Sequence, residues 1–82
     1  MAIDTKYGRV TLEHGDIGDD EPVVVFRAQD RTLPALLIEY RERCLEAGSP
    51  VEHLDALEAT RDRVEAWQAD HPTKTPGERT QP

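Results

Sequence analysis

Two helices are predicted to meet at residues 45–52, which read Leu-Glu-Ala-Gly-Ser-Pro-Val-Glu. Gly48 suits the left-handed conformation that ends a helix, because it has no Cβ. Ser49 is a preferred capping residue, Pro50 suits the first helical position, and Glu52 stands three residues after the cap. A connection this short makes the two helices antiparallel neighbours, so the sequence predicts an αα-hairpin.

The first helix is expected to begin near Leu33, with Asp30 or Thr32 as its cap and Pro34 in its first turn. Apolar residues then recur at spacings of three and four, which is typical of an amphipathic helix. They are Leu33, Leu36, Leu37, Tyr40, Cys44 and Ala47. The second helix is expected to span residues 50–70 and to bury a similar stripe. That stripe comprises Val51, Leu54, Leu57, Val64 and Trp67.

A β-hairpin is predicted before the helices. Residues 7–13 alternate, with Val10 and Leu12 on one face, as in a half-buried strand. Residues 14–22 contain two glycines, a proline and four acids, which favour a loop. Residues 23–26, Val-Val-Val-Phe, lack alternation, so a strand there needs cover on both faces. One layer of helices covers one face only, which predicts a homo-oligomer; cover by the N-terminal segment is the alternative.

The chain of 82 residues has room for one domain. The fold class predicted is α+β, with an N-terminal antiparallel β-hairpin followed by an antiparallel αα-hairpin. This single ββαα domain is expected to span residues 1–71. A disordered tail is expected at residues 72–82, because they contain three prolines and no large apolar residue. Cys44 is the only cysteine, so no disulfide within the chain is predicted, and the composition suits a reducing cytoplasm.

The charge balance excludes several classes of protein. Seventeen acidic residues against ten Lys and Arg give a net charge of -7, which disfavours direct binding to nucleic acid. No apolar run approaches the roughly 20 residues of a membrane span, so no association with a membrane is expected. The three histidines and Cys44 are scattered, and therefore neither a metal site nor a cofactor is predicted. No motif combines a nucleophile with a base, which predicts a protein that is not an enzyme.

Residues 26–31, Phe-Arg-Ala-Gln-Asp-Arg, concentrate polar groups where a strand leads into a helix. Arg27 and Arg31 can make bidentate contacts with a phosphate or carboxylate, and Gln29 can read a base or amide edge. Tyr40 can stack on a planar ligand. The candidate ligand-binding residues are therefore Arg27, Gln29, Asp30, Arg31 and Tyr40. In the alternative interpretation, Asp30 caps the helix, Arg27 pairs with an acid, Gln29 faces water and Tyr40 packs in the core.

Four short motifs occur in a characteristic order. They are Tyr7-Gly8-Arg9-Val10-Thr11, Asp19-Asp20-Glu21-Pro22-Val23, Phe26-Arg27-Ala28-Gln29-Asp30 and Glu65-Ala66-Trp67-Gln68. Over most of residues 7–70 this order resembles small uncharacterised accessory proteins of tailed bacteriophages that infect actinobacteria. The resemblance implies a small acidic protein that acts in the cytoplasm of the bacterial host.

These observations favour a non-enzymatic accessory binding protein that forms a homo-oligomer. In its more specific form, the hypothesis is a sponge that sequesters a nucleotide-like immune signal, because arginines near a helix N-terminus suit an anionic ligand. One alternative is an acidic inhibitor or DNA mimic that binds a host protein, based on the net charge. Another is a minor assembly factor of the virion.

Overall fold

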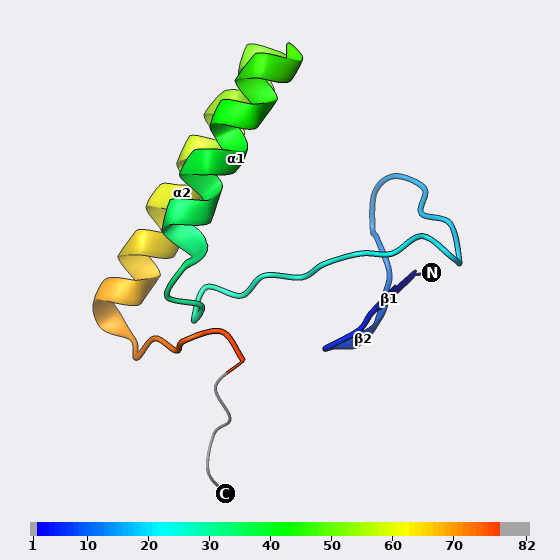
Figure 1. The fold of residues 1–82 in the computed structure, drawn as a ribbon, viewed down its shortest axis with the longest axis horizontal. Coiled ribbons are helices and arrows are strands. Elements are labelled where there is room, and N and C mark those ends of the chain that lie inside the picture. Colours follow the sequence, from blue (N-terminus) through cyan, green and yellow to red (C-terminus); the bar gives the residue numbers. More distant parts are fainter. Residues whose placement is uncertain (1, 78–82) are drawn as a thin grey trace, which may run out of the picture.

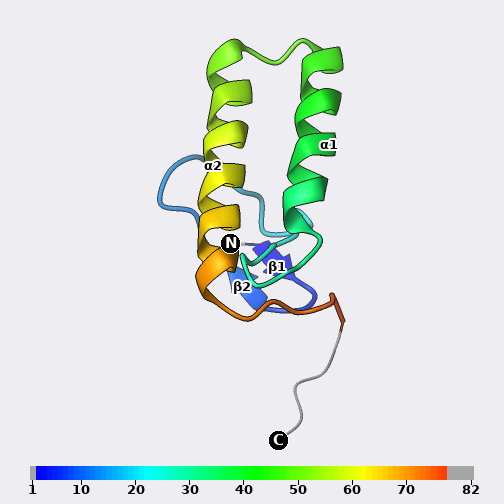
Figure 2. The ribbon, with the colours of Figure 1, turned by 90° about the vertical axis from the view of Figure 1, so that its left-hand side faces the viewer.

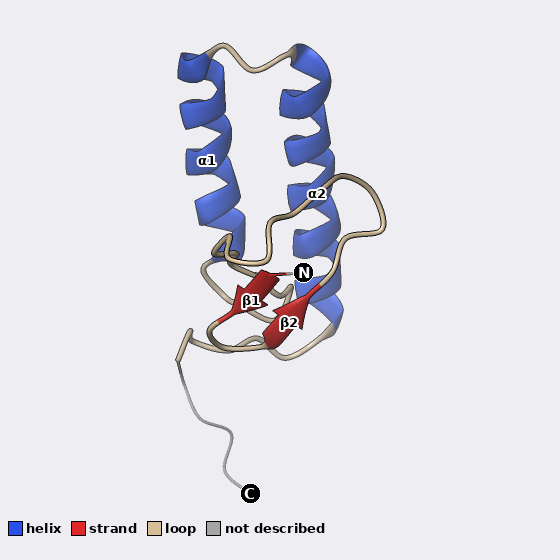
Figure 3. Ribbon diagram, turned by 90° about the vertical axis from the view of Figure 1, so that its right-hand side faces the viewer, coloured by secondary structure: helices blue, strands red, loops and turns tan. Residues whose placement is uncertain are grey.

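The computed structural model describes residues 2–77 and contains two short strands followed by two helices (Figure 1). The strands are β1 (Ala2–Asp4) and β2 (Gly8–Val10), and the helices are α1 (Leu33–Ala47) and α2 (Val51–Asp70). This order confirms the predicted α+β class. The β-hairpin and the loop after β2 lie on one side of the paired helices (Figure 3). No helix within residues 2–77 has the length and apolar character needed to cross a membrane.

The αα-hairpin is confirmed, with α1 and α2 side by side (Figure 2). Gly48 has a φ of +86°, which favours glycine strongly. The backbone N–H of Ser49 donates to the carbonyl oxygen of Cys44 at 2.9 Å, and that of Gly48 donates to Leu45 at 3.1 Å. These bonds satisfy carbonyl groups that the end of α1 would otherwise leave without partners.

The predicted capping box at the start of α2 is wrong. Pro50 occupies the capping position, in an extended conformation, and α2 begins one residue later than predicted. Ser49 therefore stands too far from the first turn of α2, and no side chain makes a capping hydrogen bond there. The carbonyl oxygen of Pro50 accepts from the backbone N–H groups of His53 and Leu54, which begins the helix without a side-chain cap.

The hydrophobic core is small. Its buried apolar side chains are Ala2, Leu33, Cys44, Leu54 and Val64. Five other members of the predicted apolar stripes are exposed, namely Leu36, Tyr40, Ala47, Val51 and Trp67. A single neighbouring helix covers only the residues that point directly at it, so positions at the margins of each stripe remain in contact with solvent.

The β-hairpin is formed by different strands from those predicted. β2 lies within the predicted strand at residues 7–13, but its partner is β1 and not residues 23–26. The pairing is antiparallel, with Ala2 opposite Val10 and Asp4 opposite Gly8. Only three residues connect the paired ends, and Gly8 adopts a φ of +91° to close the turn. This short connection is among the common hairpin loops, whereas the predicted nine-residue loop is not.

Residues 23–26 run beside β1 without forming a regular strand. Pro22 makes an isolated parallel bridge with Ile3, and the backbone N–H of Val25 donates to Oδ2 of Asp4 at 2.9 Å. Pro22 has no N–H to contribute to a ladder, and a side chain takes the place of a backbone acceptor. The N-terminal segment therefore flanks the apolar run, but Val24 remains 71% exposed and Phe26 52% exposed.

Asp4 is buried and holds the turn after β1 together. Its Oδ1 accepts hydrogen bonds from the backbone N–H groups of Lys6 at 2.8 Å and Tyr7 at 2.7 Å, and its Oδ2 accepts from Val25. The bonds from Tyr7 and Val25, with a smaller effect of Lys6, lower the pKa of Asp4 below 3.8. A lowered carboxyl pKa stabilises the folded state at neutral pH, and that stabilisation is lost as the pH falls through the lowered pKa.

We therefore expect the carboxyl carbon of Asp4 to titrate below pH 3.8 in the folded protein, measured by NMR. The Asp4→Asn variant carries no charge at this position. Its free energy of unfolding should therefore fall less steeply on acidification than that of the wild-type protein. A titration of Asp4 at or above pH 3.8 would contradict this role.

The start of the predicted tail is ordered against the loop before α1. The backbone N–H of Lys74 donates to Gln29 O at 2.7 Å, and Arg31 N–H donates to Lys74 O at 2.9 Å. Backbone pairing at Lys74 differs from the expectation of disorder from residue 72, which rested on composition alone. The rest of the predicted tail, residues 78–82, lies outside the described residues.

Candidate functional site

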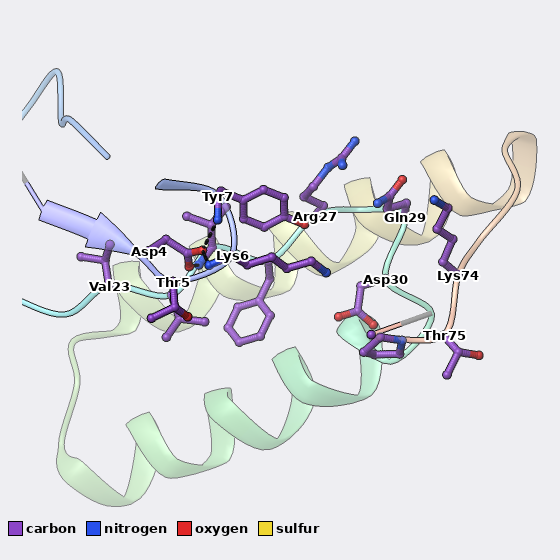
Figure 4. A pocket seen from close by; sticks show the side chains of 15 residues that line it. Asp4, Thr5, Lys6, Tyr7, Val23, Arg27, Gln29, Asp30, Lys74 and Thr75 are labelled. Carbon is purple, nitrogen blue, oxygen red and sulfur yellow. Dashed lines mark hydrogen bonds between the residues drawn. The ribbon is translucent and has the colours of Figure 1, made fainter. Parts of the chain in front are cut away.

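A pocket of about 420 Å³ lies between the turn after β1, the segment that leads to α1 and residues 74–77 (Figure 4). Its volume is within the range of about 300–1,000 Å³ that is usual for small-molecule sites. The lining residues are Asp4, Thr5, Lys6, Tyr7, Val23, Val24, Val25, Phe26, Arg27, Gln29, Asp30, Lys74, Thr75, Pro76 and Gly77. Three segments far apart in the sequence thus meet at one site.

Cationic and aromatic side chains gather in this pocket. The Nζ atom of Lys6 lies 5.4 Å from the centre of the Tyr7 ring, and Cζ of Arg27 lies 5.9 Å from it. Both distances are within the range of cation–π interactions. Lys74 approaches from the opposite wall (Figure 4). Three cationic side chains therefore line one pocket in a protein of net charge -7.

The polar wall of the pocket is formed by Gln29 and Asp30. Oδ1 of Asp30 accepts hydrogen bonds from the backbone N–H of Thr32 at 2.8 Å and from its hydroxyl at 2.7 Å. Asp30 thereby orders the entry to α1, whose capping position is held by Thr32. The backbone N–H of Asp30 also donates to Arg27 O at 2.9 Å, and this bond closes the turn that carries both residues.

Gln68 of α2 holds the loop that forms this wall. Its Nε2 donates to Ala28 O at 2.9 Å and to Asp30 O at 2.8 Å. Two backbone carbonyls of the loop are thus attached to the second helix by one side chain. Gln68 is not among the residues that line the pocket, so it acts through the loop as a positioning residue.

We expect Gln68→Ala to weaken ligand binding by about tenfold, because it removes two hydrogen bonds that fix the loop at about 0.5–1.5 kcal/mol each. The helix content at room temperature should be unchanged, since the two bonds from Gln68 hold the loop and not the helices. Calorimetric titration measures the first quantity and circular dichroism the second. Thr60→Ala is the matched control, because the Thr60 hydroxyl bonds only Ala56 O within α2. Equal affinities for the two variants would contradict the positioning role.

The structure brings together three of the five predicted site residues: Arg27, Gln29 and Asp30. Arg31 points instead to Thr73, with Nε 3.3 Å from the Thr73 hydroxyl, and so helps to hold the segment that carries Lys74. Tyr40 lies on α1, where its ring meets the His53 ring edge-on at 6.4 Å. A hydrogen bond with Cys44 raises the pKa of Tyr40.

Sequence reasoning missed Lys6, Tyr7 and Lys74. A Lys-Tyr pair directly before Gly8 is a signal for exposed side chains on a tight turn, and it was available in the sequence. Lys74 gave no comparable signal, because its position depends on backbone pairing with Gln29, which lies 45 residues earlier in the chain.

The pocket lining combines charged, aromatic, amide and hydroxyl side chains. Its described lining offers three cations, one aromatic ring from the turn, an amide and two carboxylates, but neither histidine nor cysteine. No group of three or more potential metal-ligating side chains occurs within residues 2–77.

No family model, curated protein or solved structure matches this chain.

Proposed function

We propose that this protein is a non-enzymatic binding protein that captures a small, anionic, nucleotide-like molecule. The observation that carries the proposal is the placement of Lys6 and Arg27 beside Tyr7, with Lys74 on the opposite wall of the same pocket. Cationic side chains attract phosphate groups, and charge-assisted hydrogen bonds to phosphate are among the strongest polar contacts in proteins.

The other lining residues suit the ring of such a ligand. Tyr7 and Phe26 offer aromatic faces on which a base can stack. Gln29 supplies both a donor and an acceptor, and the Oδ2 atom of Asp30 is an acceptor for an exocyclic amine. A nucleotide satisfies both sets of groups, whereas inorganic phosphate or an uncharged nucleoside satisfies only one.

In keeping with the phage accessory proteins that its motifs resemble, we propose that the protein acts in the cytoplasm of a bacterial host. Capture of a nucleotide immune signal would lower its free concentration without any chemical step, so stoichiometric binding suffices. We also propose that it is a homo-oligomer, because many large apolar side chains are exposed on the single chain.

The proposal is tested with AMP, GMP, their 3′,5′-cyclic forms, cyclic di-AMP and cyclic di-GMP, by thermal shift and calorimetry. A ligand at 100 times its Kd stabilises the fold by about 2.7 kcal/mol. For a domain of this size, that raises Tm by roughly 10–20 °C. Adenosine and inorganic phosphate are the controls, and each should give a much smaller shift.

Binding of at least one nucleotide with these weak controls would support the sponge hypothesis. If none of the six nucleotides binds or shifts Tm, the proposed ligand class is wrong. Equal shifts from inorganic phosphate would reduce the site to a general anion site and would remove the role assigned to Tyr7 and Gln29.

A further inference from the structure

One broad side of the αα-hairpin carries no other segment of the described chain. The β-hairpin and the loop after β2 lie toward the opposite side (Figures 2 and 3). On α1, Ile38 and Leu45 each follow a residue that faces α2, namely Leu37 and Cys44. One residue further along a helix is a turn of about 100°, which directs Ile38 and Leu45 to the uncovered side. Ile38 is 43% exposed and Leu45 is 59% exposed.

A groove of about 110 Å³ lies between the helices and includes Ile38 in its lining. Two arginines, Arg41 of α1 and Arg61 of α2, line it together with two glutamates, Glu42 and Glu58. Nε of Arg61 is buried and has no hydrogen-bond partner within the described residues. A buried N–H without an acceptor is costly, and this atom is shielded from solvent within the single chain.

Arg41 donates from Nε to Leu54 O at 3.3 Å, and the ion pairs of both guanidinium groups are long. Arg61 approaches Asp62 at 3.8 Å, and Arg41 approaches Glu58 at 3.9 Å. Both distances exceed those of hydrogen bonds, which are typically below about 3.2 Å for N–H to oxygen. The exposed part of the Arg41 guanidinium can therefore contact a further carboxylate, flanked by apolar groups that match Ile38 and Leu45.

The exposed area of the chain is large enough to supply an interface. Its accessible surface is 6647 Å², whereas a compact monomer of 9.3 kDa exposes about 5,000 Å². A standard interface buries about 800 Å² on each partner.

We propose that a second copy of this chain docks on the groove through an antiparallel pairing of the two α1 helices about a two-fold axis. With the axis between Arg41 and Glu42, Ile38 of one copy meets Leu45 of the other, because both lie equally far from the axis. Arg41 of each copy then meets Glu42 of the other. A two-fold interface must be self-complementary, and this register pairs apolar with apolar and cation with anion.

The proposal predicts a dimer in native mass spectrometry and light scattering of the full chain. Leu45→Asp should raise the dimer Kd by at least about tenfold, because a charge is buried against the partner's Ile38. Glu42→Arg should have a similar effect, since it places like charges opposite each other. The double variant Arg41→Glu with Glu42→Arg restores opposite charges across the axis and should recover most of the dimer.

Two controls keep the result specific. Arg43→Glu reverses a charge five residues after Ile38, about 140° around α1 and away from the proposed interface, and should leave the dimer intact. Val24→Asp probes the exposed apolar run beside β1 and should also leave it intact. A monomeric wild-type chain would overturn the proposal. So would a dimer that Val24→Asp dissociates and Leu45→Asp does not, or a failure of the double variant to recover association while circular dichroism shows it folded.

Discussion

Replacement of Arg27 by glutamate is expected to lower the affinity for the best-binding nucleotide by about 100-fold or more. Arg27 lies beside the Tyr7 ring and belongs to the cationic side of the pocket. Its reversal removes charge-assisted hydrogen bonds and sets a carboxylate against the ligand phosphate, which together cost about 2–5 kcal/mol. Each 1.4 kcal/mol corresponds to a factor of ten in Kd. Isothermal titration calorimetry at fixed ionic strength measures the change.

Arg63→Glu is the matched control, because it makes the same change in net charge on an exposed position of α2 outside the pocket. It should alter the affinity by less than about threefold through long-range, salt-screened effects. If Arg27→Glu and Arg63→Glu bind with the same Kd, the pocket described above is not the nucleotide site, whether or not the protein binds nucleotides.

Truncation of Leu54 to alanine is expected to lower the melting temperature by roughly 10–30 °C. Leu54 is only 6% exposed and is one of five buried apolar residues in the described chain. Removal of a buried leucine side chain costs about 2–5 kcal/mol. In a domain of this size each kcal/mol shifts Tm by about 4–8 °C. Far-UV circular dichroism during heating follows the loss of both helices.

Leu12→Ala removes the same atoms from a loop residue that is 49% exposed, and it should shift Tm by only a few degrees. A small shift for Leu54→Ala would mean that the αα-hairpin draws its stability from contacts outside the single chain. Repetition at several protein concentrations distinguishes this case, because a dimer melts at a temperature that rises with concentration.

The helices were predictable from sequence because their signals are local. Gly48 ends α1 as expected, and the spacing of Leu33, Cys44, Leu54 and Val64 places them in the core. The strands were less predictable, because residues 23–26 have strong β propensity but follow a proline. The pairing of β1 with β2 instead depends on Asp4 and Gly8, which close a three-residue connection.

About half of the pocket was predictable, because the residues concerned also carry a local sequence signal. Arg27, Gln29 and Asp30 lie in one continuous motif, so a single local argument found all three. Lys6, Tyr7 and Lys74 reach the site through long-range bonds, such as those from Val25 to Asp4 and from Lys74 to Gln29. Such bonds follow from the tertiary arrangement and have no sequence pattern of their own.

The assembly of the pocket from distant segments also bears on the order of folding. The αα-hairpin joins residues close in sequence and should form early, whereas the pocket unites residues 4–7 with residues 74–77 and must close a far longer loop. The same few hydrogen bonds that complete the pocket last can break first, while both helices remain intact. Release of a captured molecule would then be timed by local opening of the Lys74 segment and not by unfolding of the protein.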